Sequence, residues 1–142
     1  MDYRKQAHAV YYTRYHIVVS TKYRRPIFKP GIGEYLRKII YQINDHLPDI
    51  EIVEVNTDLD HMHILMSIPP KYSVAMIVNK IKANTGRKMR NRFPHLDKTY
   101  WGVKGIWSIG YFVSTVGIGE EIIKKYIQMQ SKEDSGQAEL AF

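Results

Sequence analysis

Hydrophobic and polar positions follow a strand-like spacing in four segments of the chain. Residues 11–20 (YYTRYHIVVS) and 107–116 (WSIGYFVSTV) are rich in aromatic and β-branched side chains. Residues 50–56 and 61–68 alternate less regularly and are joined by a short polar turn at 57–60. These two segments are therefore predicted to form an antiparallel hairpin.

Three other segments have apolar residues three and four positions apart, which is the spacing of a helix. Residues 32–46 form the first, Ser73 can cap a second that runs to about Arg92, and the third spans 120–132. The first six elements then follow the order of a ferredoxin-like (RRM-like) domain, an α+β fold with helices on one face of an antiparallel sheet. We predict one domain over residues 1–132 and a flexible tail at 133–142.

Composition narrows the class of protein. The chain has 142 residues and no cysteine, which excludes a disulfide scaffold and any thiolate metal or redox site. No apolar run approaches the roughly 20 residues of a membrane helix, and the N-terminus lacks the apolar core of a secretory signal. We therefore expect a cytoplasmic protein with no membrane partner.

Positive charge is concentrated in two basic groups. The first is residues 22–25, and the second is the set of Lys and Arg residues between Lys80 and Arg92. The formal net charge is +7, and no Asp or Glu occurs between Lys71 and Leu96. Such patches attract polyanions, although a solvated face balanced elsewhere in the fold is the alternative. Tyr23 could stack on an unpaired base or simply pack at a strand end. The candidate DNA-binding residues are Lys22, Tyr23, Arg24, Arg25, Lys80, Lys82, Arg87, Lys88 and Arg90.

Two histidines flank one apolar residue in the segment His61-Met62-His63. Because side chains alternate faces along a strand, both imidazoles are predicted to point the same way. Two imidazoles side by side are half of a divalent-metal site, although most such pairs are ordinary surface histidines. Asp58 and Asp60 could orient an imidazole through its other nitrogen.

A further pair of polar residues lies on the last predicted helix. Tyr126 and Gln130 are four positions apart and so share one helical face. The amide oxygen of a glutamine suits Mg²⁺ or Mn²⁺, and a tyrosine one turn away would stand beside such an ion. The chain has 11 tyrosines, however, and most tyrosines are packing residues.

At these residues the chain resembles the single-tyrosine HUH transposases of small bacterial insertion sequences, including the REP-associated tyrosine transposases. His61-Met62-His63, within DHMHIL, is similar to the His-hydrophobic-His signature of that family. Residues 126–130 (YIQMQ) resemble its YIxxQ segment, and residues 15–28 and 107–117 resemble two further blocks. The resemblance covers residues 10–131.

The resemblance implies a chemistry and its parts. Tyr126 would attack a phosphodiester of single-stranded DNA, forming a 5′-phosphotyrosine link and releasing a 3′-hydroxyl without ATP. His61, His63 and Gln130 would hold the divalent ion, Mg²⁺ or Mn²⁺. The substrates would be imperfect DNA hairpins at the element ends.

The resemblance also implies a homodimer in which the tyrosine helix of one subunit completes the site of the other, with residues 117–119 as a hinge. Three alternatives stay open: a domesticated endonuclease acting on repeated palindromic DNA, a replication initiator or relaxase, and a non-catalytic nucleic-acid-binding module. Paired hairpins flanking the gene would indicate a mobile element.

Overall fold

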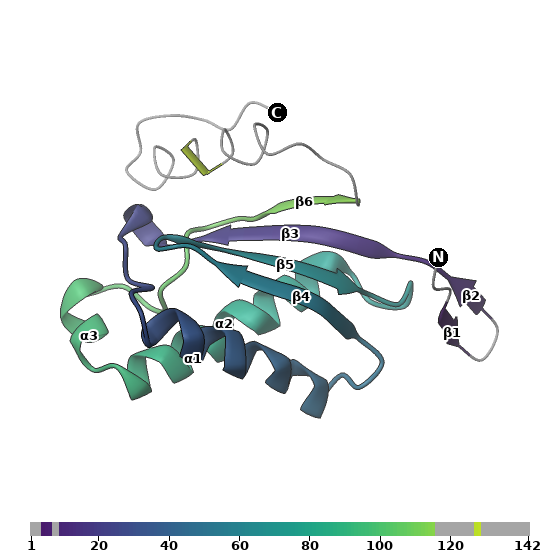
Figure 1. Ribbon diagram of the computed structural model, residues 1–142, viewed down its shortest axis with the longest axis horizontal. Coiled ribbons are helices and arrows are strands. Elements are labelled where there is room, and N and C mark those ends of the chain that lie inside the picture. The colour runs from purple at the N-terminus through teal and green to yellow at the C-terminus, as the bar shows by residue number, and fades with distance from the viewer. Residues whose placement is uncertain (1–3, 7–8, 116–126, 129–142) are drawn as a thin grey trace.

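A four-stranded antiparallel sheet forms the centre of the computed structural model, which describes residues 4–6, 9–115 and 127–128. The strand order is β4–β5–β3–β6, so the first and third predicted strands lie in the middle (Figure 1). This order confirms the predicted ferredoxin-like α+β fold. The strands are β3 (Arg14–Ser20), β4 (Glu51–Thr57), β5 (His61–Ser67) and β6 (Phe112–Thr115).

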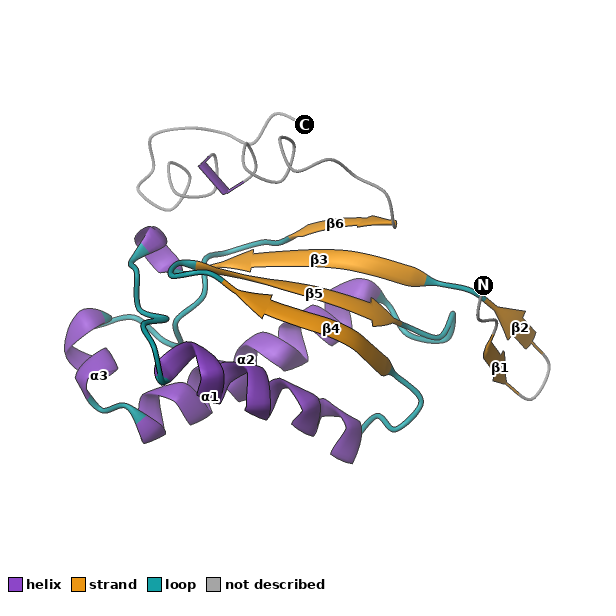
Figure 2. Cartoon of the chain, viewed as in Figure 1, coloured by secondary structure: helices purple, strands orange, loops and turns teal. Residues whose placement is uncertain are grey.

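Both long helices lie against one face of the sheet (Figure 2). The first, α1 (Ile32–Ile40), continues as a tighter 3₁₀ turn, η2 (Tyr41–Asp45), and together they match the predicted helix. The second, α2 (Val74–Arg92), begins as predicted at Ser73, whose hydroxyl accepts a hydrogen bond from the Met76 amide at 3.1 Å. A short helix that the sequence pattern does not predict, α3 (His95–Thr99), follows Pro94.

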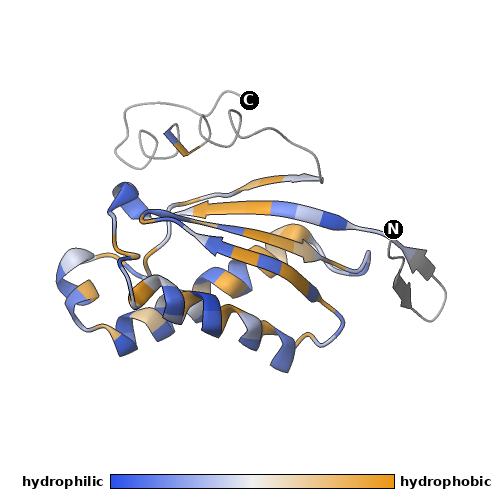
Figure 3. Cartoon of the chain, viewed as in Figure 1, coloured by the Kyte–Doolittle hydropathy of each residue, from blue (hydrophilic) through white to orange (hydrophobic). Residues whose placement is uncertain are grey.

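The helix-facing side of the sheet is the hydrophobic core. Met62, Ile64 and Met66 on β5 are at most 1% exposed, whereas His61 and His63, which alternate with them, are partly exposed. Apolar positions accordingly line the sheet and the inner sides of the helices, and hydrophilic positions face outward (Figure 3). Within the described part of the chain, no helix is long and apolar enough to cross a membrane.

The first predicted strand is divided between two sheets. Tyr11 ends β2 (Ala9–Tyr11), which pairs with β1 (Arg4–Gln6) in a small separate hairpin, and β3 begins only at Arg14. Between them the Thr13 carbonyl accepts a hydrogen bond from the Ile68 amide at 3.1 Å. The chain therefore stays attached to the main sheet while it changes direction.

The last predicted strand is shorter than residues 107–116. Trp107 forms only an isolated bridge with Thr21, and the ladder resumes at Phe112. Between these points Gly110 has a φ of +87°, and the Lys82 ammonium donates hydrogen bonds to the carbonyls of Ser108, at 2.8 Å, and Gly110. Backbone groups that a strand would pair with its neighbour are thus satisfied here by a side chain.

An irregularity in β4 explains the imperfect alternation of residues 50–56. The pairing register of β4 with β5 shifts between Ile52 and Glu54, so Val53 is an extra residue in the ladder and is 37% exposed. A bulge of this kind reverses the inward and outward order of the positions that follow it. The predicted hairpin is otherwise confirmed.

A buried hydroxyl joins α2 to the loop before β6. Thr85 Oγ1 accepts a hydrogen bond from the Trp107 indole at 3.0 Å and donates one to the Ile81 carbonyl at 2.6 Å. Thr85→Val keeps the shape but leaves the indole donor unpaired, which should lower the free energy of unfolding by about 1–3 kcal/mol. Urea denaturation measures this, with Thr99→Val, at a more exposed helical threonine, as control. An equal loss in the two variants would contradict the expectation.

Candidate functional site

His61 and His63 project from β5 on the face of the sheet opposite the helices. In the ladder with β3, His61 is paired with Ser20 and His63 with Val18. The two imidazole centroids are 4.8 Å apart, with the ring planes inclined at 68°. The predicted side-by-side arrangement is therefore present, and β5, a central strand paired on both sides, supplies a rigid base for it.

Carboxylates contact both ring nitrogens of His61. Asp60 Oδ1 lies 2.8 Å from Nδ1, and Asp58 Oδ2 lies 3.4 Å from Nε2. The other oxygen of Asp60 forms an ion pair with Arg24, at 3.0 Å from its Nε. The hydrogen bond from His61 holds the pKa of Asp60 below its ordinary value; burial partly offsets this, and the hydrogen bond and charge of Arg24 lower the pKa further. Asp60 thus connects the turn after β3 to the ring of His61.

The lowered pKa of Asp60 predicts how the stability depends on pH. A carboxylate with a depressed folded-state pKa stabilises the fold above its unfolded pKa, near 3.8, and loses this contribution as the pH falls through the folded value. Asp60→Asn should therefore destabilise the protein at neutral pH, and its difference from wild type should shrink below pH 3.8. Denaturation over a pH series measures this, with the exposed Asp45→Asn as control. A difference that stayed constant at low pH would rule this role out.

His16 is a third histidine at the site, and it is not among the residues predicted from the sequence. Its Nε2 lies 3.2 Å from Nδ1 of His63, and the ring centroids are 5.4 Å apart. Burial lowers the pKa of His16, partly offset by the charge of Glu54. The strand period could have indicated His16. His16 is two residues before Val18, so both side chains lie on one face of β3, and Val18 is paired with His63.

Tyr126 and Gln130 lie outside the described residues, but the neighbouring Ile127 is described. Ile127 and Gln128 are helical, and Ile127 is 5% exposed. Ile127 packs with Val18, which is paired in the sheet with His63, and with Phe112 of β6. The residue next to Tyr126 in sequence is thus buried against the face that carries the histidines.

The predicted metal ligands can be compared with the structure only in part. No group of three or more His, Cys, Asp or Glu side chains among them is arranged to hold an ion. His61 and His63 nevertheless have the chemistry of ligands, since each contacts a hydrogen-bonding partner at Nδ1, which would leave Nε2 as the nitrogen that binds a metal. The predicted third ligand, Gln130, belongs to the part of the chain that is not described.

The first basic group lies beside this site, at the end of β3. Lys22, Tyr23 and Arg24 form the 3₁₀ turn η1 (Lys22–Arg24), in which Tyr23 and Arg24 have φ values of +59° and +51°. Such values are uncommon for residues other than glycine, so the turn is held in a strained conformation. Tyr23 is 42% exposed, with the cationic groups of Lys22 and Arg25 within 6 Å of its ring.

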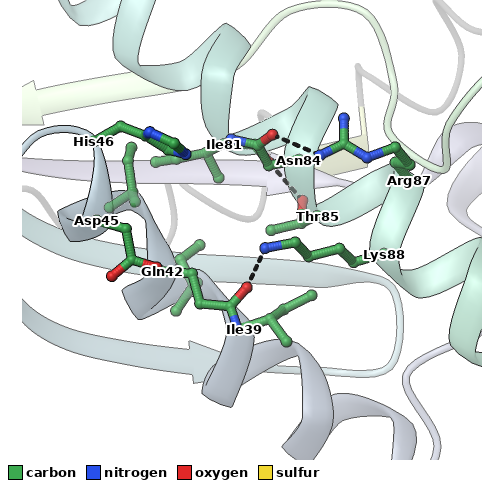
Figure 4. A pocket seen from close by; sticks show the side chains of 11 residues that line it. Ile39, Gln42, Asp45, His46, Ile81, Asn84, Thr85, Arg87 and Lys88 are labelled. Carbon is green, nitrogen blue, oxygen red and sulfur yellow. Dashed lines mark hydrogen bonds between the residues drawn. The ribbon is translucent and has the colours of Figure 1, made fainter.

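The second basic group lies on α2, in the helical layer and therefore across the sheet from the histidines (Figure 2). Near η2, Lys88 donates to Gln42 and Arg87 donates to Asn84 at 3.1 Å (Figure 4), while Lys80 is exposed. Lys82 and Arg90 instead bind loop carbonyls: Lys82 those of Ser108 and Gly110, and Arg90 those of Val103 and Gly105, besides the Asp97 carboxylate.

Comparison with known proteins places this geometry in a family. The profile described as "Transposase IS200 like" matches residues 9–130. The transposase for insertion sequence element IS200 of Salmonella typhimurium is 34% identical over 137 residues, covering 94% of this chain and 86% of the relative. The ISDra2 transposase TnpA of Deinococcus radiodurans is 27% identical over 131 residues, covering 92% of each protein.

A solved structure supports the same family assignment. The crystal structure of a protein assigned as a transposase from Deinococcus radiodurans R1 matches with a TM-score of 0.78 and 28% identity, over 89% of this chain and 97% of that one. The residues matched by the family profile include His61, His63, Tyr126 and Gln130.

Proposed function

Because this chain belongs to the IS200-like transposase family, we propose that it cleaves and rejoins single-stranded DNA through a covalent 5′-phosphotyrosine intermediate. One observation carries the proposal. Two imidazoles, each held at Nδ1, share the open face of the sheet, and Ile127, next to Tyr126 in sequence, is buried against that face. A purely structural histidine pair needs no such neighbour.

Tyr126 is the proposed nucleophile. Its hydroxyl oxygen bonds to the phosphorus of a DNA phosphodiester, and the bond from that phosphorus to the 3′-oxygen breaks. The tyrosine loses its proton, and the departing 3′-oxygen gains one. Because one phosphodiester replaces another, no ATP is consumed, and the reverse attack by a 3′-hydroxyl rejoins DNA. A tyrosine has an ordinary pKa near 10, so a nearby cation favours the attacking phenolate.

We assign the metal to His61, His63 and Gln130. When bound, Mg²⁺ or Mn²⁺ would polarise the scissile phosphate and offset the negative charge that develops on it. Asp60 orients His61 toward this role through its hydrogen bond at Nδ1. The carboxylate of Asp58 lies 3.4 Å from Nε2 of His61 and is 72% exposed, so it would have to give up this contact when Nε2 binds a cation.

The two basic groups suit two parts of a hairpin substrate. Lys22, Tyr23 and Arg25 lie beside the histidines, where an unpaired base can stack on Tyr23 while the cations contact the phosphates. Lys80, Arg87 and Lys88 on α2 are the cations proposed to hold the backbone of a paired stem. Arg87 and Lys88 also donate to Asn84 and Gln42. Lys82, Arg90 and Arg24 likewise bind protein groups, so the DNA-binding role of all these cations stays a prediction.

A homodimer supplies the two nucleophiles that cutting and joining two DNA ends requires. A contact of Ile127 with Val18 of the same subunit would complete the site with that subunit's own helix. Helix exchange between subunits would make the same contact across the dimer. Mixing a His61→Ala His63→Ala subunit with a Tyr126→Phe subunit separates the two arrangements, because only exchanged helices restore an intact site.

The direct test is incubation of the protein with single-stranded hairpin DNA and Mg²⁺, followed by a denaturing gel. We expect a covalent protein–DNA product that carries the label of the fragment downstream of the cut, because the tyrosine holds its 5′-phosphate. EDTA should prevent its formation, and the same sequence as perfect duplex should give none. Cleavage without a covalent product would contradict the proposal.

A further inference from the structure

The proposed ligand His63 has its own hydrogen-bonding partner on the neighbouring strand. His16 lies on β3, two ladder pairs along from the pair formed by Val18 and His63, and therefore on the same face. Nε2 of His16 is 3.2 Å from Nδ1 of His63, with the ring planes inclined at 36°. Because β3 is paired with both β5 and β6, its backbone holds His16 at a fixed place beside His63.

The contact restricts where His63 can carry its hydrogen. A neutral imidazole has one N–H donor and one nitrogen with a lone pair, and a metal binds at the lone pair. If Nδ1 of His63 donates to Nε2 of His16, the lone pair of His63 is at Nε2. The opposite assignment, with His16 donating, would put the hydrogen on Nε2 and prevent that nitrogen from binding a cation.

We propose that His16 is a positioning residue: it accepts the Nδ1–H of His63 and so holds His63 in the tautomer and orientation that bind the divalent metal through Nε2. This inference rests on the metal site of the proposed function. The matched arrangement at His61 supports it, because there Asp60 occupies the same Nδ1 position. Two different partners, a carboxylate and an imidazole, thus prepare the two rings in the same way.

Direct coordination by His16 is the competing role, and the geometry disfavours it. Nε2 of His16 lies on the Nδ1 side of His63, away from the nitrogen that would face the ion. In the ladder with β6, His16 is paired with Ser114, whose buried hydroxyl has no hydrogen-bond partner in the described structure. To reach the ion, His16 would have to turn away from His63 and give up its hydrogen bond.

Two measurements on the full-length protein test the role. The first is the tautomer of His63 in the metal-free protein, read from long-range ¹H–¹⁵N correlations of the imidazole rings. The second is Mn²⁺ affinity, measured by electron paramagnetic resonance. His16→Phe removes the acceptor but keeps a ring, and His16→Gln offers a carbonyl oxygen near the position of Nε2. His95→Phe, at an exposed histidine of α3, is the matched control.

We expect wild-type His63 to carry its hydrogen on Nδ1. His16→Phe should shift His63 toward the Nε2–H tautomer and weaken Mn²⁺ binding about 10- to 100-fold. His16→Gln should restore most of both, and His95→Phe should change neither. A merely structural role would leave the tautomer unaltered and would not be rescued by glutamine.

Three results would overturn the inference. They are an unchanged His63 tautomer in His16→Phe, equal Mn²⁺ affinity in wild type and His16→Phe, and a loss in His16→Gln as large as in His63→Ala. Failure of the proposed function looks different: the wild type itself would bind no Mn²⁺, or would bind it as well after His61→Ala and His63→Ala.

Discussion

Tyr126→Phe is expected to abolish the covalent protein–DNA product, with a loss of at least about a thousandfold. The substitution removes only the hydroxyl oxygen that becomes bonded to phosphorus, so no other group on the same side chain can replace it. The measurement is the denaturing gel with labelled hairpin DNA and Mg²⁺. Binding of the hairpin, measured by gel shift, should be unchanged, because the aromatic ring is retained.

A matched control separates chemistry from folding in this experiment. Tyr41 is 47% exposed in η2, on the helical side of the sheet, so Tyr41→Phe should form the product at the wild-type rate. A product that survived Tyr126→Phe would assign the nucleophile to a different residue. Equal loss in both variants would point to an effect on the fold rather than on the reaction.

The double substitution His61→Ala His63→Ala is expected to have the second largest effect. Removing both imidazoles leaves Gln130 as the single proposed ligand, so Mn²⁺ affinity should fall by more than about 100-fold. This loss exceeds the one expected when only the hydrogen-bonding partner of a ligand is removed, as in His16→Phe. The covalent product should disappear with it. Hairpin binding should persist, because the basic residues at η1 and on α2 are unaltered.

Thermal unfolding provides the control for this pair. Both histidines are half-buried on the open face of the sheet, whereas the core residues Met62 and Ile64 face the helices. The variant should therefore stay folded, with a melting temperature somewhat below that of His95→Ala because the hydrogen bond of His61 to Asp60 is lost. Retained Mn²⁺ affinity in a folded variant would show that the ion, if bound, is held elsewhere.

Local sequence patterns were sufficient to predict most strands and helices, and to predict that the two histidines share one face of β5. The alternation of Met62, Ile64 and Met66 with the two histidines predicted a strand with a buried and an open side, and the structure confirms it. Ser73 marked the start of α2. The pattern predicted too long a last strand. At Ser108 and Gly110 the backbone carbonyls accept hydrogen bonds from the distant Lys82 side chain, and the strand period carries no information about such a partner.

The basic residues illustrate the same limit. The stretch from Lys71 to Leu96 is free of acids, and this alone suggested that its cations face a polyanion. In the fold, Arg90 binds the Asp97 carboxylate from α3 and two loop carbonyls, and Arg24 binds Asp60. Charge counted along a chain does not reveal these partners, since they come from segments that meet only after folding.

The sequence by itself determined the ferredoxin-like order of elements, the shared face of His61 and His63, and the family to which the chain belongs. These features depend on the spacing of residues within short segments, because the period of a strand or helix fixes the side on which each side chain lies. The tertiary structure alone decided that His16 contacts His63, that Asp60 joins Arg24 to His61, and that Ile127 is buried against Val18. Each of these contacts depends on strand register or on packing across the sheet, which bring together residues that are far apart in the chain.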